Sequence, residues 1–79
     1  EGVEVGLTYR QHRDGSFRIS VRTSGSIDAC NIARRLGGGG HTRAAGCEIS
    51  GNLDNAKHAV LEEVRKELQR CGLLDQDAG

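Results

Sequence analysis

Four consecutive glycines, Gly37 to Gly40, constrain the fold of this 79-residue chain more than any other feature. Each glycine makes folding less favourable because it leaves the unfolded backbone with more freedom. Four in a row therefore predict positive φ angles, a close approach to the main chain, or both. The run also offers backbone N–H groups without neighbouring side chains, and His41, Thr42 and Arg43 follow directly. We predict that this segment is a phosphate-binding loop in which the N–H groups form an anion-binding nest.

The glycine run matches neither of two common phosphate-binding motifs, the Walker A loop and the Rossmann Gly-x-Gly-x-x-Gly fingerprint. No Gly-Lys-Ser/Thr sequence follows it, which excludes a Walker A loop, and it comes after a predicted helix rather than before one. A helix C-terminus is the unfavourable end of the helix dipole for an anion. If phosphate binds here, we expect loop N–H groups and side chains to donate to it. The alternative interpretation is a flexible connection between a helix and a strand.

Two segments at the start of the chain alternate apolar and polar residues, which is typical of half-buried strands. They cover residues 3–10 and 17–24 and predict a hairpin. A three-residue loop ending at Gly15 pairs Tyr9 with Ile19 and keeps the apolar side chains of both strands on one face. We therefore expect a type I turn with Gly15 in the left-handed conformation of a G1 bulge.

The polar side chains of the second strand share the opposite face. Arg22 and Ser24 lie at its C-terminal end, where sheets of α/β proteins tend to bind ligands. We expect these two residues to belong to the site. Arg18 and Ser20 lie nearer the hairpin, and we expect them to form a solvated face.

Two helices and a third strand are predicted after the hairpin. The first helix has its N-cap at Ser26 and ends at Gly37, and a short strand begins near Ala45. Asn52 caps a long second helix that ends at Gly72. The apolar face of that helix is predicted to contain Leu53, Ala56, Val60, Leu61, Val64 and Leu68.

The predicted order ββαβα indicates one small α+β domain over residues 1–79, with a mixed sheet and two helices. We expect its core to cover about residues 3–72 and residues 73–79 to be a frayed tail. The strand-helix-strand unit from residues 17 to 50 is expected to be a right-handed crossover between parallel strands.

Three cysteines, Cys30, Cys47 and Cys71, form no CxxC motif, so we expect reduced thiols in a cytoplasmic protein. A zinc site from Cys30, His41 and Cys47 could be imagined, but its spacing matches no structural zinc motif. There is no apolar run of about 18 residues and no signal-peptide pattern, so no membrane partner is expected. Because the chain lacks methionine and begins with Glu1, we expect it to be a piece of a larger protein.

The glycine run and its surroundings resemble the DHH-associated domain (subtype 1), the C-terminal module of DHH-family phosphoesterases. The likeness is carried by the Gly-Gly-Gly-Gly-His-Thr-Arg-Ala-Ala-Gly motif at 37–46, by Val-Arg-Thr-Ser at 21–24 and by Ile-Asp at 27–28, and extends over roughly residues 3–70. The most similar branch is the bifunctional oligoribonuclease and pAp phosphatase group (nano-RNases). RecJ-like nucleases and cyclic-dinucleotide phosphodiesterases are relatives.

In that family, a manganese-binding DHH domain performs hydrolysis and the DHH-associated domain binds the substrate. The resemblance implies a hydrolase parent that acts on short single-stranded nucleic acid or pAp, with the DHH domain as partner. It implies neither a catalytic residue nor a metal ligand in this chain, which lacks the Asp-His-His motif, so the chain alone should be inactive. Relatives often place a lysine or another polar residue at positions 42 and 43, so the roles of these two residues stay open. The substrate-binding residues implied are Arg22, Ser24, Gly37, Gly38, Gly39, Gly40, His41, Thr42 and Arg43.

Other functions remain as alternatives. One is a nucleic-acid-binding or editing-associated module without a hydrolase partner, as in the related domain of alanyl-tRNA synthetases. Others are the substrate domain of a cyclic-dinucleotide phosphodiesterase, and a dimerisation domain, although the sequence has no exposed apolar seam. The chain has one Phe and one Tyr, both assigned to the core side, so we expect phosphate recognition to dominate over base stacking.

Overall fold

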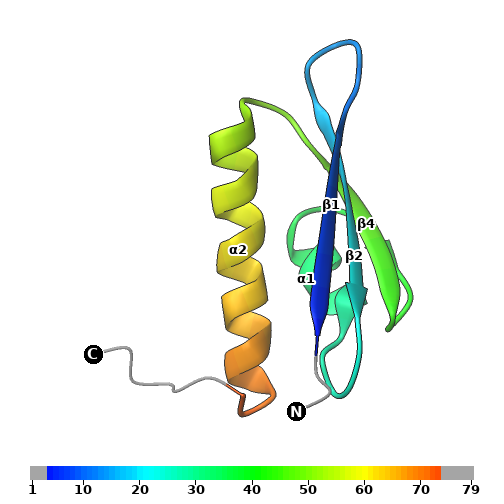
Figure 1. Ribbon diagram of the computed structural model, residues 1–79, viewed down its shortest axis with the longest axis vertical. Coiled ribbons are helices and arrows are strands. Elements are labelled where there is room, and N and C mark those ends of the chain that lie inside the picture. Colours follow the sequence, from blue (N-terminus) through cyan, green and yellow to red (C-terminus); the bar gives the residue numbers. More distant parts are fainter. Residues whose placement is uncertain (1–3, 74–79) are drawn as a thin grey trace.

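The computed structural model describes residues 4–73 and contains a four-stranded sheet and two helices (Figure 1). The strands lie in the order β1-β2-β4-β3. The predicted α+β class is confirmed. In chain order the elements are β1 (Val5–Gln11), β2 (Phe17–Thr23), α1 (Ala29–Arg35), β3 (Gly39–Gly40), β4 (Ala44–Ile49) and α2 (Leu53–Arg70).

The β1–β2 hairpin has the predicted register, because Tyr9 pairs with Ile19. The N–H of His12 donates to the carbonyl of Ser16 at 2.8 Å, which leaves a three-residue loop. Gly15 has a φ angle of 94°, so the left-handed conformation expected of it is confirmed. This register directs the odd-numbered side chains of β2 into the core and the even-numbered ones to the opposite face.

The predicted parallel crossover is wrong, because β2 and β4 are antiparallel neighbours. The chain leaves α1 into β3, a two-residue strand formed by Gly39 and Gly40. A tight turn at Thr42 and Arg43 then reverses the chain into β4, which pairs antiparallel with β3. In the order β1-β2-β4-β3, each of the neighbouring pairs is antiparallel. The sheet is therefore not mixed.

The first helix begins later than predicted. Its N-cap is Asp28, whose carboxylate accepts the N–H of Asn31 at 3.1 Å, so the predicted cap at Ser26 is wrong. A cap at Ser26 would place Ile27 in the first helical turn, whereas Ile27 precedes the helix and is fully buried in the core. The predicted end at Gly37 is confirmed by its φ angle of 88°.

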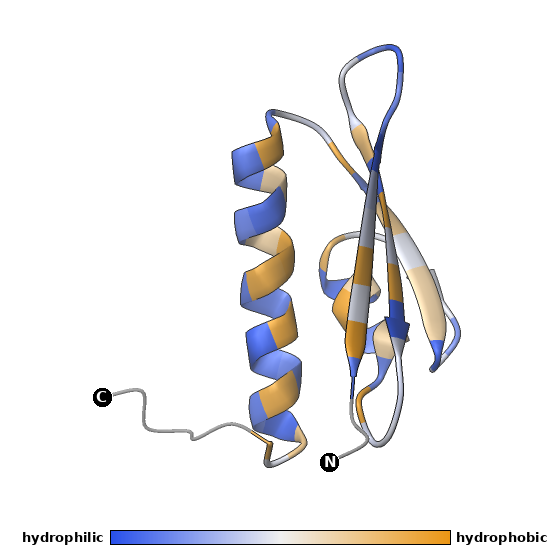
Figure 2. Ribbon diagram, viewed as in Figure 1, coloured by the Kyte–Doolittle hydropathy of each residue, from blue (hydrophilic) through white to orange (hydrophobic). Residues whose placement is uncertain are grey.

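The second helix begins after its N-cap Asn52 and ends before Gly72, as predicted. Apolar and polar residues alternate along it (Figure 2). Leu53 and Leu61 are 37% and 55% exposed, so their assignment to the apolar face is wrong. Leu61 follows the buried Val60 and is therefore rotated by about 100° from the stripe that faces the sheet. The buried residues of α2 are Ala56, Val60, Val64 and Glu67.

One apolar core joins the inner face of the sheet to both helices. Phe17 and Ile19 of β2 pack in the same cluster as Ile32 of α1 and Val60 of α2. Both helices therefore cover one face, and the other face is open. Neither helix in residues 4–73 has the length and apolar character needed to cross a membrane. The tail predicted for 73–79 lies, apart from Leu73, outside the described residues.

Candidate functional site

The open face of the sheet is hollowed over β2, β3 and β4. The hollow has a volume of about 240 Å³ and opens to solvent. Most of its lining residues carry either a guanidinium group or little side chain at all. They are Arg18, Ser20, Val21, Arg22, Gly39, Gly40, Ala44, Ala45 and Gly46.

Small residues form the floor of the hollow. Gly46 of β4 pairs with Gly39 of β3 on one side and with Ser20 of β2 on the other. Paired residues project to the same face of a sheet, so these three positions are neighbours on the open face. Arg18 and Arg22 lie two residues before and two residues after Ser20, on that same face. The result is a flat floor between two arginines.

Arg18 reaches into the hollow, contrary to expectation. A Cβ atom on Gly46 would lie 2.7 Å from Nη2 of Arg18, so the guanidinium group lies across this glycine. Gly46 is buried although it is on the open face. Arg18 is exposed on the open face, as predicted, and both Arg18 and Ser20 also line the hollow, which was not predicted. Strand spacing gives the position of the Arg18 backbone, but not the direction in which its long side chain leans.

Glu48 of β4 forms an ion pair with Arg18. Its Oε2 lies 3.3 Å from Nη1 of Arg18, and its Oε1 lies 2.8 Å from Nε2 of His12. The hydrogen bond with His12, supported by that from Arg18, lowers the pKa of the Glu48 carboxyl group. The carboxylate is therefore ionised at neutral pH and shared between two basic side chains.

Arg22 and Ser24 differ in whether their side chains already have partners within the fold. The side chain of Arg22 is exposed and makes no hydrogen bond or ion pair within residues 4–73. Ser24 does not line the hollow, since its hydroxyl accepts the N–H of Glu4 at 2.8 Å and its own N–H donates to the carbonyl of Glu4 at 3.1 Å. Ser24 thus extends the β1–β2 pairing. Its predicted role in substrate binding stays a prediction.

The first two glycines of the run end α1. The N–H groups of Gly37 and Gly38 donate to carbonyl groups in the last turn of the helix at 3.0 and 2.9 Å, which is a Schellman motif. The N–H of His41 donates to the carbonyl of Ala44 at 2.8 Å. These three N–H groups are occupied, so the predicted nest of consecutive free donors does not form from them.

Two glycines of the run, Gly38 and Gly40, lie in close contact with β4. A Cβ atom on Gly38 would lie 2.1 Å from the carbonyl oxygen of Gly46, and one on Gly40 would lie 2.6 Å from a backbone atom of β4. Gly40 also has a φ angle of 147°. At Gly39 a Cβ would meet no atom within 4 Å. The predicted close approach is thus confirmed at Gly38 and Gly40, and only Gly39 has open space above it in the hollow.

The turn after β3 is fastened to the loop before α1. The carbonyl of Thr42 accepts the N–H of Ala29 at 2.7 Å, and the guanidinium group of Arg43 donates to a carbonyl of the same loop. The neighbouring His41 is exposed, and its side chain has no hydrogen bond or ion pair with any described residue. Thr42 and Arg43 therefore hold the turn, while His41 directly follows Gly40, which lines the hollow.

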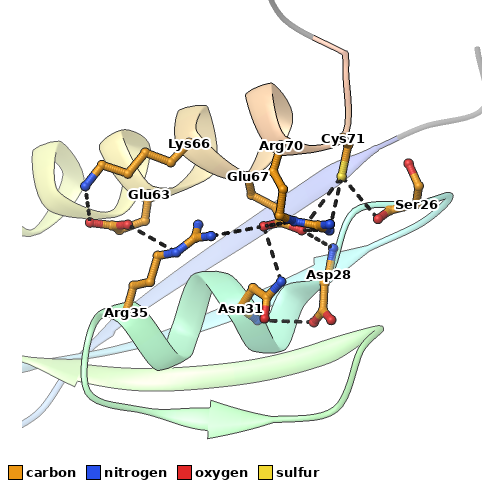
Figure 3. Close-up of polar contacts among 9 residues, drawn as sticks. All are labelled: Ser26, Asp28, Asn31, Arg35, Glu63, Lys66, Glu67, Arg70 and Cys71. Atoms are coloured by element: carbon orange, nitrogen blue, oxygen red, sulfur yellow. Dashed lines mark hydrogen bonds and ion pairs between the residues drawn. The ribbon is translucent and has the colours of Figure 1, made fainter. Parts of the chain in front are cut away.

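A polar cluster where α1 meets α2 was not predicted (Figure 3). Glu67 is fully buried, accepts the N–H of Asp28 at 3.0 Å, and accepts two hydrogen bonds from Arg70 at 3.0 and 2.5 Å. Arg35 lies 3.5 Å away. Burial alone would raise the pKa of Glu67, but the hydrogen bonds from Arg70 and Asp28 outweigh it and lower the pKa. The available signal was the helical spacing that places Glu67 on the buried stripe of α2.

No metal site is assembled in the part of the chain that the structure describes. Within residues 4–73, no three His, Cys, Asp or Glu side chains are grouped so that they could hold an ion. The conceivable zinc ligands Cys30, His41 and Cys47 are therefore not brought together. All three cysteines are free thiols, and burial raises the pKa of Cys47.

The amino-acid sequence of the chain is similar to those of known proteins. The model of the DHHA1 domain matches residues 1–70. The bifunctional oligoribonuclease and PAP phosphatase NrnA of Thermus thermophilus is 47% identical over 75 residues, which cover 94% of this chain and 23% of that protein. The oligoribonuclease NrnB of Bacillus subtilis is 54% identical over 37 residues, 46% of this chain and 9% of that protein. The predicted family resemblance is confirmed, and the chain spans less than a quarter of either relative.

Proposed function

Because the chain belongs to the DHHA1 domain family, we propose that it is the substrate-binding domain of a longer DHH-type phosphoesterase. Both relatives are named as oligoribonucleases, and one is also named as a PAP phosphatase. The proposed substrates are accordingly short oligoribonucleotides and pAp. Their phosphates would bind in the hollow over β2, β3 and β4.

The observation that carries this proposal is the guanidinium group of Arg22, which has no partner within residues 4–73, beside a floor of glycines. A guanidinium group donates two parallel hydrogen bonds to a phosphate and keeps its charge at any physiological pH. The missing side chains of Gly39 and Gly46 allow a sugar-phosphate chain to approach the sheet closely. His41, which follows the lining residue Gly40, would supply a further donor.

Manganese-dependent hydrolysis requires metal ligands that the described residues lack. They do not fit a divalent metal ion, because no cluster of metal-ligating side chains exists among them. Glu48, the acid that contacts the hollow through Arg18, is engaged by two basic groups. We therefore assign manganese and the DHH domain to a part of the protein outside these 79 residues. The chain by itself should bind substrate without turning it over.

Recognition should depend on phosphates rather than on bases. Phe17 is 7% exposed and packs in the core, and Tyr9 projects to the same face of the sheet. Neither aromatic ring is presented to the hollow, so a stacking platform for bases is missing there. Phosphate contacts position a ligand but do not read its sequence. Weak base preference follows from this arrangement.

The proposal is tested in the longer protein that contains this chain. Its gene should encode an Asp-His-His motif, and Arg22→Ala should lower kcat/KM for pAp by about 10- to 150-fold, the value of a charge-assisted contact. Arg13→Ala, in the exposed hairpin loop, is the matched control and should change nothing. Nucleotide binding by a protein without the motif would favour a binding module that has no hydrolase partner. Equal losses in both variants would indicate a diffuse basic surface.

A further inference from the structure

The guanidinium group of Arg18 lies nearer to the level of Arg22 than the position of the Arg18 backbone on β2 indicates. Arg18 and Arg22 are four residues apart, which corresponds to about 13 Å along a strand. The guanidinium group of Arg18, however, leans across Gly46, which pairs with Ser20 midway between them. Its charge therefore lies only about two residues, or 7 Å, from the level of Arg22.

The contacts of Arg18 contribute little to stability. Arg10 of β1 is its direct cross-strand partner, and like charges in opposed positions destabilise a sheet. The compensating pair with Glu48 spans 3.3 Å, with the two side chains 45% and 52% exposed, and exposed pairs contribute little. A phosphate can therefore replace Glu48 as the partner of Arg18. Glu48 would keep its contact with His12 at 2.8 Å.

We propose that the hollow binds two phosphates that are one nucleoside apart, with Arg22 contacting one phosphate and Arg18 the other. Two phosphates on the 3′ and 5′ sides of one ribose are separated by a comparable step. The ligand class is therefore a nucleoside 3′,5′-bisphosphate such as pAp, or the phosphorylated end of an oligonucleotide. This inference rests on the proposed function, and it adds that Arg18 selects two-phosphate ligands over those with one phosphate.

A substitution at Gly46 can displace the guanidinium group of Arg18 without removing the arginine. A Cβ atom there would lie 2.7 Å from Nη2 of Arg18 and 3.1 Å from the carbonyl oxygen of Ile19. The guanidinium group is the more mobile of these neighbours and would be displaced. Gly46→Ala should therefore weaken binding of the second phosphate, as Arg18→Ala does, while the arginine remains present.

The test compares pAp with 5′-AMP, which lacks the second phosphate, in NMR titrations of the ¹⁵N-labelled 79-residue chain at low salt. The amide signals of Gly39, Gly40 and Gly46 report on the hollow, and the whole spectrum reports on folding. Wild type should bind pAp about 10-fold or more tightly than AMP, the contribution of one charge-assisted contact. Arg18→Ala should remove this preference without changing AMP binding. Arg18→Lys should retain part of it, since the charge remains but the planar fork is lost.

Arg10→Ala is the matched control, because Arg10 pairs with Arg18 but does not line the hollow. It should leave both affinities unchanged. The inference is overturned if Arg18→Ala weakens AMP and pAp equally, if it changes neither, or if Arg10→Ala has the same effect. In those cases a loss of both ligands in Arg22→Ala would leave the proposed function standing. If neither ligand shifts the hollow signals of wild type, the proposed function fails and the inference with it.

Discussion

On the helical side of the molecule, Arg35 and Arg70 both contact one buried carboxylate, that of Glu67. On the open side of the sheet, Arg22 has no acidic partner within residues 4–73, and Arg18 shares the exposed Glu48 with a histidine. The same residue type thus serves structure in one region and is available to a ligand in the other. The difference lies in the supply and burial of acids, because a buried carboxylate binds its partners strongly and an exposed one is easily displaced.

The two regions meet at the loop between β2 and α1. Glu67 accepts the N–H of Asp28 on one side of this loop. The next residue, Ala29, donates to the carbonyl of Thr42 in the turn that follows β3. The polar cluster therefore fixes the loop against which the turn carrying His41 is held. Changes in the cluster should affect stability, and changes on the open face should affect binding.

The largest expected effect is that of Glu67→Ala. Removing the carboxylate leaves the buried N–H of Asp28 and the guanidinium group of Arg70 without this acceptor, while Arg35 keeps only its pair with Glu63. We expect a loss of about 3 kcal/mol in the free energy of unfolding. Urea unfolding of the 79-residue chain measures this. Glu62→Ala, which breaks an exposed pair with Arg65, is the control and should cost at most about 0.5 kcal/mol. Equal losses would remove the distinction between the two regions.

His41→Ala should act only on function. The exposed side chain has no partner among the described residues, so the melting temperature should stay unchanged. In the longer enzyme we expect kcat/KM to fall by about 100-fold, the usual loss for one donor to a transition state. The melting temperature and the turnover, measured for the same variant, check both expectations. A lower melting temperature with normal turnover would assign His41 to the structure instead of the site.

Gly38 and Gly39 are neighbours in one segment but have different surroundings. Gly38→Ala forces a Cβ against the carbonyl of Gly46 and should lower the free energy of unfolding by about 1–3 kcal/mol. Gly39→Ala meets no atom and should stay within about 0.5 kcal/mol. Thermal melts compare the two. The bulkier Gly39→Val should weaken nucleotide binding because the valine occupies the hollow. A stable Gly38→Ala variant would contradict the close approach of the two strands.

The smallest effect concerns pH. The pKa of Glu67 is lowered in the folded chain from its usual value of 4.5, so its contribution to stability is present above that value and is lost as pH falls through the folded pKa. Glu67→Gln should remove this part of the acid dependence. Urea unfolding between neutral and acidic pH, compared for wild type and variant, isolates Glu67 from the other carboxylates. Parallel curves would show that Glu67 does not titrate differently on folding.

Features that depend on residues close together in the chain could be read from the amino-acid pattern alone. Alternation fixed the β1–β2 register, and Gly15, Gly37 and Gly72 marked a turn and two helix ends. Such signals are readable because the interactions that enforce them lie within a few residues along the chain. The glycine-histidine motif identified the family for the same reason, since its residues are consecutive.

The order of the strands and the composition of the hollow, in contrast, could be seen only in the three-dimensional fold. Spacing along the chain did not reveal that β4 inserts between β2 and β3, which turned a predicted parallel unit into an antiparallel sheet. The lean of Arg18 onto Gly46 and the burial of Glu67 were hidden for the same reason. Each depends on contacts between residues more than twenty positions apart, which pairing and packing select among many alternatives that local pattern leaves open.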